Sequence, residues 1–99
     1  MGRMSAVEIR AAMATVEGWT RKGQRLTREF CLDDFAGAIR FVGRVARAAE
    51  EAWHHPDIDI RWNRVRLSLT THDEGGLTER DFVLAARFNQ IASGRRRRP

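Results

Sequence analysis

Cysteine is almost absent from this chain of 99 residues, where Cys31 is the only one. No disulfide can form within a chain that has one cysteine, and such a composition fits a reducing compartment. No apolar run approaches the ~20 residues that a membrane-spanning helix needs. The first residues also lack the apolar segment of a signal peptide. We therefore expect a cytoplasmic protein without a membrane partner.

Lysine is equally scarce, because 17 of the 18 basic residues are arginine. The net charge of +5 is unevenly distributed: residues 1–49 carry +4, residues 50–94 carry −3 and the terminal arginine run carries +4. We interpret the arginine excess as a composition bias. The terminal run has neither interleaved aromatic residues nor a recognition motif, so nucleic acid is not favoured as a partner. The length predicts one domain, residues 1–94, followed by a basic disordered tail at 95–99.

Helical and alternating patterns of apolar residues divide the domain into short elements. Ser5 and Glu8 form a capping-box pattern that begins the first helix, and Asp34 suits the N-terminus of a long central helix. Pro56 is expected to end that helix, because the residue before a proline avoids the helical region. The predicted elements are a helix at 5–16, strands at 19–21 and 24–32, a helix at 33–53, strands at 58–62 and 65–71, a loop at 72–76 and a helix at 78–93.

Turn and capping signals support this order. Asn63-Arg64 predicts a tight hairpin turn between the last two strands, because asparagine tolerates positive φ. Thr78 and Asp81 form a second capping-box pattern before the last helix. Arg28 interrupts the apolar face of the strand at 24–32. The predicted fold class is α+β, a two-layer sandwich in which an antiparallel sheet of three to four strands carries about three helices on one face.

The histidines are concentrated in a short part of the chain, and each lies at the end of a predicted element. His54 and His55 end the central helix, and His72 ends the last strand. Glu50 and Glu51 precede His54 and His55 by four residues each, which places each pair on one helix face. A nearby carboxylate and a helix C-terminus both favour the imidazolium form. Such a group can protonate a departing hydroxyl, which is general acid catalysis.

Two other interpretations of these histidines remain open on the residues alone. His54 and His55 can be partners of the helix dipole, with Pro56 as the helix stop. A zinc site is the second alternative, but no cysteine lies nearby and the usual ligand spacings are missing. We therefore predict no metal.

The segment from Glu50 to Pro56, followed by Trp62, His72 and Asp81, resembles the signature of the pterin-4a-carbinolamine dehydratases. In that family an acidic residue is followed, after three positions, by His-His-Pro, and then by an aromatic residue, a histidine and an aspartate. The resemblance covers about residues 5–92. Its further features are Trp19 after a short helix, Phe30 before an Asp-Phe pair, Thr71-His72-Asp73 and Gly75-Gly76-Leu77-Thr78. Trp53 departs from the pattern, because a smaller or polar residue is commoner there.

The resemblance implies a reaction and its partners. The substrate would be a 4a-hydroxytetrahydropterin released by an aromatic amino acid hydroxylase, and loss of water would give a quinonoid dihydropterin. No metal or organic cofactor is expected, since the pterin is the substrate. Members of the family form homodimers or homotetramers. The central helix or a sheet edge is the natural contact, because an open edge of a small sheet is a liability.

The resemblance also suggests roles for the histidines. It makes His54 and His72 the candidate acid and base, while His55 holds the pterin and shares the proton transfer. If the last strand extends to His72, this side chain lies on the polar face of the sheet, opposite Val65, Leu67 and Leu69.

Four further residues have both a functional and a structural interpretation. Trp19 either walls the pterin ring or packs in the core. Asp81, with its neighbour Arg80, either supports the pterin site or caps the last helix. Glu50 either orients His54 or is a solvated surface side chain.

A non-catalytic role is the main alternative to the enzyme. Some family members dimerise a homeodomain transcription factor, and some relatives act as assembly factors for a carbon-fixing enzyme. A chain kept only for binding has no reason to retain three histidines at these positions, which favours the dehydratase. Another alternative keeps the same chemistry on a different pterin, for example one linked to molybdopterin metabolism.

Overall fold

The computed structural model describes residues 2–94. The predicted basic tail, residues 95–99, lies outside the described residues. The elements, in chain order, are helix α1 (Ala6–Met13), strands β1 (Thr20–Lys22) and β2 (Arg25–Cys31), helix α2 (Phe35–Ala52), strands β3 (Asp57–Arg61) and β4 (Arg64–Leu69), the 3-10 turn η1 (His72–Glu74) and helix α3 (Glu79–Gly94).

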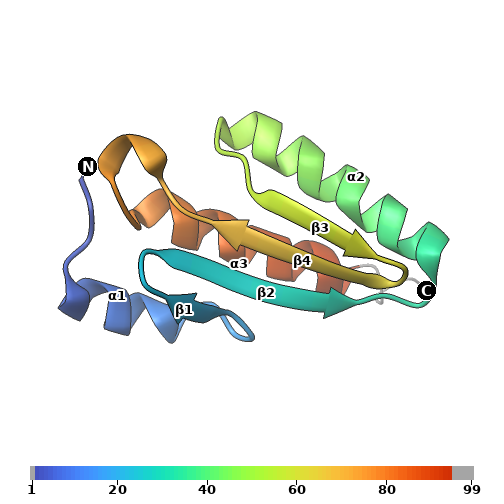
Figure 1. The fold of residues 1–99 in the computed structure, drawn as a ribbon, viewed down its shortest axis with the longest axis horizontal. Helices are drawn as coiled ribbons and strands as arrows, with labels where there is room; N and C mark the ends of the chain where they lie inside the picture. The colour runs from blue at the N-terminus through green and yellow to red at the C-terminus, as the bar shows by residue number, and fades with distance from the viewer. Residues whose placement is uncertain (1, 95–99) are drawn as a thin grey trace.

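The four strands form one antiparallel sheet in the order β1-β2-β4-β3. The helices form a second layer behind the sheet in Figure 1, and the sheet face toward the viewer carries no helix. The β3–β4 hairpin lies at one end of the molecule, whereas η1 and the last turn of α2 lie at the other. The predicted α+β sandwich is therefore confirmed.

The core lies between the sheet and the helices because alternate residues of the inner strands point to one side. Strand β4 shows this alternation, with three buried aliphatic side chains separated by polar ones. Helices α2 and α3 present buried aromatic residues to the same layer. The core includes Leu26 and Phe30 from β2, Val65, Leu67 and Leu69 from β4, Phe41 and Val45 from α2, and Phe82 and Phe88 from α3.

Arg28, which interrupts the apolar face of β2, is accommodated by polar groups at the edge of the core. Its NH1 group donates to the Glu17 carbonyl oxygen at 3.1 Å and to Asn89 Oδ1 at 2.7 Å. Its guanidinium carbon lies 4.4 Å from the centroid of the Phe30 ring. A cation over an aromatic face with two hydrogen-bond acceptors can remain half-buried.

The caps at the helix starts follow the sequence signals. Ser5 Oγ accepts from the Glu8 backbone N–H at 3.2 Å, and Glu8 Oε1 accepts from the Ser5 N–H at 2.8 Å, so the predicted capping box is confirmed. Asp34 Oδ1 accepts from the Gly37 N–H at 2.7 Å and caps α2.

Helix α2 ends at Ala52, within one residue of the predicted end at 53, but Trp53 in a left-handed conformation with a φ of 53° ends it, and not Pro56 as predicted. The ends of two other elements differ from the predictions. The hairpin turn consists of Trp62 and Asn63 instead of Asn63 and Arg64, because Arg61 pairs directly with Arg64. A positive φ of 57° at Trp62 produces this shift of one residue.

Strand β4 ends at Leu69, so His72 does not lie on the polar face of a strand as predicted. It begins η1 instead. Along residues 2–94, no helix has the length and apolar composition needed to cross a membrane.

Candidate active site

A buried contact between His54 and Asp81 forms the centre of the candidate site. His54 is the first residue after the Trp53 cap of α2, and Asp81 lies in the first turn of α3. Their side chains meet with 2.5 Å between Nε2 and Oδ1. His54 is 8% exposed and Asp81 is 0% exposed, so the pair is shielded from water.

Two threonines satisfy the second oxygen of this buried carboxylate. Asp81 Oδ2 accepts from the Thr71 hydroxyl at 2.8 Å and from the Thr78 backbone N–H at 2.9 Å. The two threonine hydroxyl oxygens lie 2.9 Å apart, and Thr78 Oγ1 also accepts from the Arg80 backbone N–H at 3.3 Å. Because the Thr71 proton is given to Asp81, Thr78 donates its proton to Thr71. Both carboxylate oxygens of Asp81 and both threonine hydroxyls therefore have hydrogen-bond partners, as buried polar groups require.

The hydrogen bonds of Asp81 also determine the tautomer of His54. An ionised carboxylate only accepts hydrogen bonds, so the Nε2 atom of His54 carries a proton. Nδ1 is then the ring nitrogen that can exchange a proton with a ligand. A buried aspartate that orients an imidazole in this way is a typical arrangement for acid–base catalysis.

His55 is placed differently from its neighbour. Its Nε2 atom lies 2.7 Å from Glu50 Oε2, and both side chains are exposed. The predicted pairing of Glu50 with His54 is therefore wrong. The predicted pairing of Glu51 with His55 is also wrong, since Glu51 Oε1 accepts from Arg87 NH2 at 2.7 Å. The left-handed Trp53 causes both differences, because the chain leaves the helix before the four-residue spacing reaches the histidines.

Arg80 holds the end of α2 against the start of α3. Its NH2 group donates to the Trp53 carbonyl oxygen at 2.8 Å, which satisfies one of the free carbonyls at a helix C-terminus. The Trp53 side chain itself is 82% exposed. Arg80 thus stabilises the turn that presents His54 to Asp81.

A cleft of about 300 Å³ adjoins His54. The residues that line it are Ala52, His54, Glu79, Arg80, Val83, Leu84 and Arg87. His55 and His72 are not among them, so the three histidines do not share this cleft. Within residues 2–94, no three histidine, cysteine or acidic side chains are grouped as metal ligands would be.

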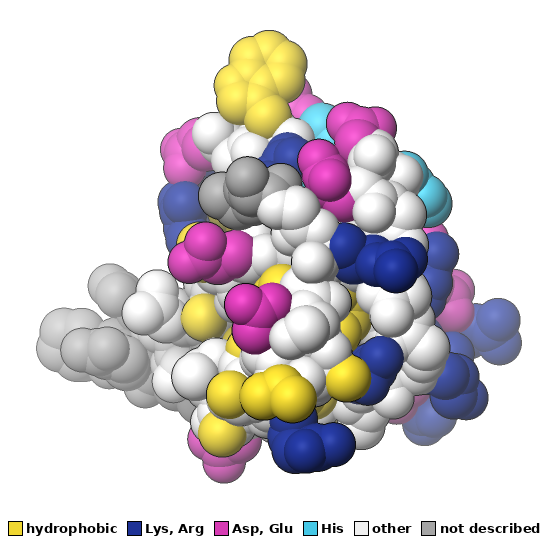
Figure 2. All heavy atoms as spheres, turned by 90° about the vertical axis from the view of Figure 1, so that its left-hand side faces the viewer, with side chains coloured by type: hydrophobic (Ala, Val, Ile, Leu, Met, Phe, Trp, Pro, Cys, Tyr) yellow, Lys and Arg dark blue, Asp and Glu magenta, His cyan; other side chains and the backbone are white. Residues whose placement is uncertain are grey.

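His72 is exposed in the first position of η1 and directly follows Thr71, the hydroxyl partner of Asp81. It therefore lies at the same end of the molecule as His54. Figure 2 views this end and shows histidine side chains (cyan) reaching the surface near acidic side chains (magenta).

Trp19 is buried in the core and is 5% exposed. Its ring stacks on Phe88 at a centroid distance of 6.4 Å and meets the edge of Phe30 at 6.1 Å. The indole N–H donates to Asn89 Oδ1 at 2.8 Å. Phe88 lies seven residues beyond Asp81 on α3, and within the described residues Trp19 forms no hydrogen bond with a histidine.

The capping-box pattern pairs Thr78 with Asp81, but nothing in the sequence predicts the hydrogen bond from Thr71 to the same carboxylate. The Thr78 N–H donates to Asp81 as such a box requires, while the other carboxylate oxygen remains available to His54. Asp81 thus makes both the contact expected of a helix cap and the contact expected of a residue that supports the site.

Comparisons with known proteins agree with this arrangement. A family model described as Pterin 4 alpha carbinolamine dehydratase matches residues 2–91. A candidate pterin-4-alpha-carbinolamine dehydratase of Roseiflexus sp. (strain RS-1) is 53% identical over 90% of this chain and 96% of its own. A protein of the same description from Chloroflexus aurantiacus (strain ATCC 29366 / DSM 635 / J-10-fl) is 54% identical over 92% of this chain and 98% of its own.

Two solved structures are also similar. A transcriptional coactivator/pterin dehydratase from Brucella melitensis has a TM-score of 0.88 and is 35% identical, over 92% of this chain and 99% of that one. A pterin dehydratase-like protein identified as a RuBisCO assembly factor in the alpha-carboxysome has a TM-score of 0.62 and is 25% identical, over 75% of this chain and 86% of that one.

Proposed function

Because the chain belongs to the pterin-4-alpha-carbinolamine dehydratase family, we propose that it is a lyase that dehydrates 4a-hydroxytetrahydrobiopterin to the quinonoid dihydropterin. The buried His54–Asp81 pair carries this proposal, because it supplies an oriented imidazole beside a cleft, and within residues 2–94 its second ring nitrogen forms no hydrogen bond. The reaction that we propose uses no metal and no organic cofactor.

The chemistry requires one group that protonates the departing hydroxyl and another that removes the proton from the ring nitrogen. Histidine can perform either task near neutral pH. We assign these tasks to His54 and His72, and we assign binding of the pterin to His55, with Glu50 beside it. Asp81 positions His54, and Arg80 maintains the turn that carries it.

The cellular role that we propose is recycling of the pterin cofactor of an aromatic amino acid hydroxylase in the cytoplasm. The single cysteine, Cys31, is free and exposed, which suits a reducing compartment. We also propose that the protein acts as a homodimer or homotetramer, with no membrane or nucleic-acid partner in the dehydratase reaction.

A second function is favoured by what is known of the two similar structures as they are described. One is described as a transcriptional coactivator as well as a dehydratase, and the other as a RuBisCO assembly factor. The alternative is therefore a non-catalytic module that dimerises or assembles another protein. A cluster of buried hydrogen bonds around His54 has no evident use in such a module, whereas it has one in catalysis.

The deciding experiment is a dehydration assay. A phenylalanine hydroxylase generates the 4a-hydroxytetrahydropterin, this protein is added, and formation of the quinonoid product is followed spectroscopically. We expect His54→Ala and His72→Ala each to lower kcat by about 100-fold or more, as loss of a general acid or base does.

Arg47→Ala provides the matched control, because this exposed side chain lies on α2 outside the candidate site. It should have the wild-type rate. A wild-type protein that gives no more product than the uncatalysed reaction would refute the dehydratase function and leave the assembly role.

A further inference from the structure

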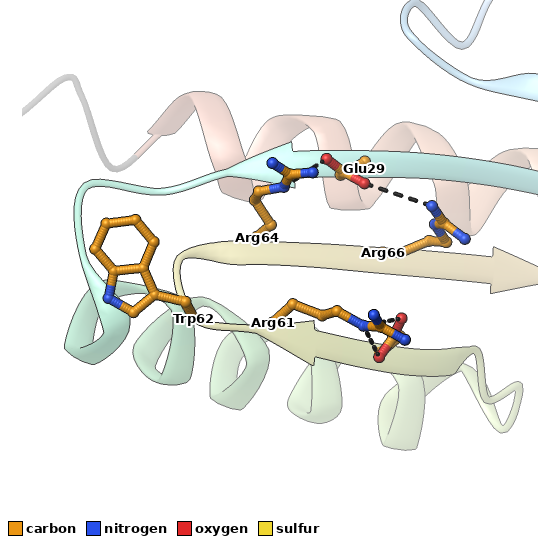
Figure 3. A pocket seen from close by; sticks show the side chains of 6 residues that line it. Glu29, Arg61, Trp62, Arg64 and Arg66 are labelled. Carbon is orange, nitrogen blue, oxygen red and sulfur yellow. Dashed lines mark hydrogen bonds and ion pairs between the residues drawn. The ribbon is translucent and has the colours of Figure 1, made fainter.

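The helix-free face of the sheet contains a hollow of about 490 Å³ at the end of the β3–β4 hairpin. Its lining is Glu29, Asp59, Arg61, Trp62, Arg64 and Arg66, drawn in Figure 3. The three guanidinium groups outnumber the two carboxylates, so the lining has a positive charge. The hairpin lies at the opposite end of the molecule from η1 and the last turn of α2, so this hollow is separate from the histidine site (Figure 1).

Two arginines oppose each other directly across the hairpin. Arg61 of β3 is the register partner of Arg64 of β4, so the two side chains lie on the same face. Like charges in this position destabilise a sheet. In the described part of the chain their carboxylate partners lie on opposite sides of the pair. The Arg61 Nε pairs with Asp59 at 3.3 Å, back along its own strand, and the Arg64 Nε pairs with Glu29 at 3.1 Å on β2.

Both arginines thus use the inner nitrogen of the guanidinium for their ion pairs. Within residues 2–94, the terminal NH groups of Arg61 and Arg64 donate no hydrogen bond to the protein. A phosphate group placed between the two side chains would accept bidentate hydrogen bonds from both and relieve their repulsion.

Trp62 provides an aromatic surface beside this pair. It occupies the first position of the turn with a φ of 57°, in a region that bulky residues rarely adopt. Its side chain is 71% exposed although it belongs to the lining of the hollow. Strained backbone positions are concentrated at functional sites, and at Trp62 the strained position places an aromatic ring in the lining of the hollow.

From this juxtaposition we propose that the hollow binds a nucleotide, with its phosphate between Arg61 and Arg64 and its base stacked on Trp62. Aromatic side chains and arginines together recognise nucleotides in this way. Every base offers a flat π surface for stacking, and every phosphate offers two oxygens that can accept a bidentate pair of hydrogen bonds from an arginine. The nucleotide can be free or part of a single strand. Because Glu29 and Asp59 repel any anion, the phosphate contacts alone give weak binding and stacking of the base on Trp62 is required as well.

The test is NMR titration of the folded wild-type chain with ADP, adenosine, inorganic phosphate and a short single-stranded oligothymidylate. We expect ADP to shift the backbone amides of residues 59–66 and to bind at least about five-fold more tightly than adenosine or phosphate, because both contacts are needed. A shift by ADP alone identifies a free nucleotide, and a stronger shift by the oligonucleotide identifies a single strand.

Three variants complete the design. Arg64→Gln and Trp62→Asn should each weaken binding by about five-fold or more, and asparagine retains the left-handed turn. Arg47→Gln, which removes the same charge on α2, should bind as the wild type does. An equal loss of ADP affinity in Arg47→Gln and Arg64→Gln would overturn the proposal. Binding of inorganic phosphate as tight as that of ADP would also overturn it, and so would the absence of binding at millimolar ADP. Dehydratase activity should be normal in all three variants, so either proposal can fail without the other.

Discussion

The imidazole of His54 and the carboxylate of Asp81 meet at 2.5 Å although the two residues are 27 positions apart in the chain. The contact joins the segment after α2 to the first turn of α3, and both side chains are buried. It therefore couples the packing of the two helices to the orientation of the ring.

Replacement of Asp81 by asparagine tests this coupling. The amide keeps the size of the side chain but removes a charge-assisted acceptor and introduces a donor among groups that already donate. We expect the free energy of unfolding to fall by about 2 kcal/mol and kcat to fall by about 10-fold or more, because a misoriented imidazole is a poor acid or base. Urea denaturation and the dehydration assay measure the two effects. Full activity in a folded Asp81→Asn protein would contradict the positioning role.

The Thr71 hydroxyl gives a more local prediction. Thr71→Val keeps the shape of the side chain and removes the proton that Asp81 Oδ2 accepts, whereas Thr71→Ser retains a hydroxyl at the same place. Loss of a buried hydrogen bond to a charged group is expected to cost about 1.5–3 kcal/mol in the valine variant. Thermal unfolding of the two variants should therefore differ by several degrees. Equal stabilities would mean that the hydroxyl is not needed.

Two glycines provide a matched pair for stability. Gly18 has a φ of 87°, and an added Cβ would lie 2.7 Å from the Arg28 guanidinium carbon. Gly43 lies within α2, and nothing lies within 4 Å of its added Cβ. We expect Gly18→Ala to destabilise the fold by about 1–3 kcal/mol through strain and crowding, and Gly43→Ala to stabilise it by up to about 1 kcal/mol. Chemical denaturation measures both changes, and a stabilised Gly18→Ala protein would contradict the packing around Arg28.

The open edge of the sheet gives a prediction about assembly. Strand β3 pairs with β4 on one side only and all five of its residues are exposed, including Ile58 at 38% and Ile60 at 36%. If this edge forms the contact between subunits, Ile60→Lys should convert the oligomer to a monomer, because charges on an edge strand oppose pairing. Light scattering after gel filtration measures the mass. Val7→Lys, at an exposed site on α1, is the control, and an oligomer unchanged in Ile60→Lys would exclude this edge.

The sequence predicted the fold well because its local patterns are strong. Apolar residues recur at helical spacing along α2, and strict alternation marks β4. The ends of elements were less predictable. Trp53 and Trp62 both adopt positive φ, for which a tryptophan gives no signal, since glycine and asparagine are the residues typical of that region. Both errors, in the glutamate–histidine pairing and in the hairpin turn, follow from these two residues.

The candidate site was predictable as a set of residues but not as a set of contacts. The family signature named His54, His55, His72 and Asp81, whereas local spacing gave only partners within one turn of helix. The contact of His54 with Asp81 joins distant segments, and it depends on how α2 and α3 pack. Periodicity describes one element at a time and does not contain that information.

The left-handed turn at Trp53 also bears on how the two neighbouring histidines tolerate change. His54 belongs to the interior, where a new side chain must fit an existing space and satisfy Asp81, while His55 belongs to the surface, where most side chains fit. Substitutions at position 54 are therefore limited by folding as well as by function, and substitutions at position 55 are limited by function alone. Variation among related chains at these two adjacent positions should differ accordingly.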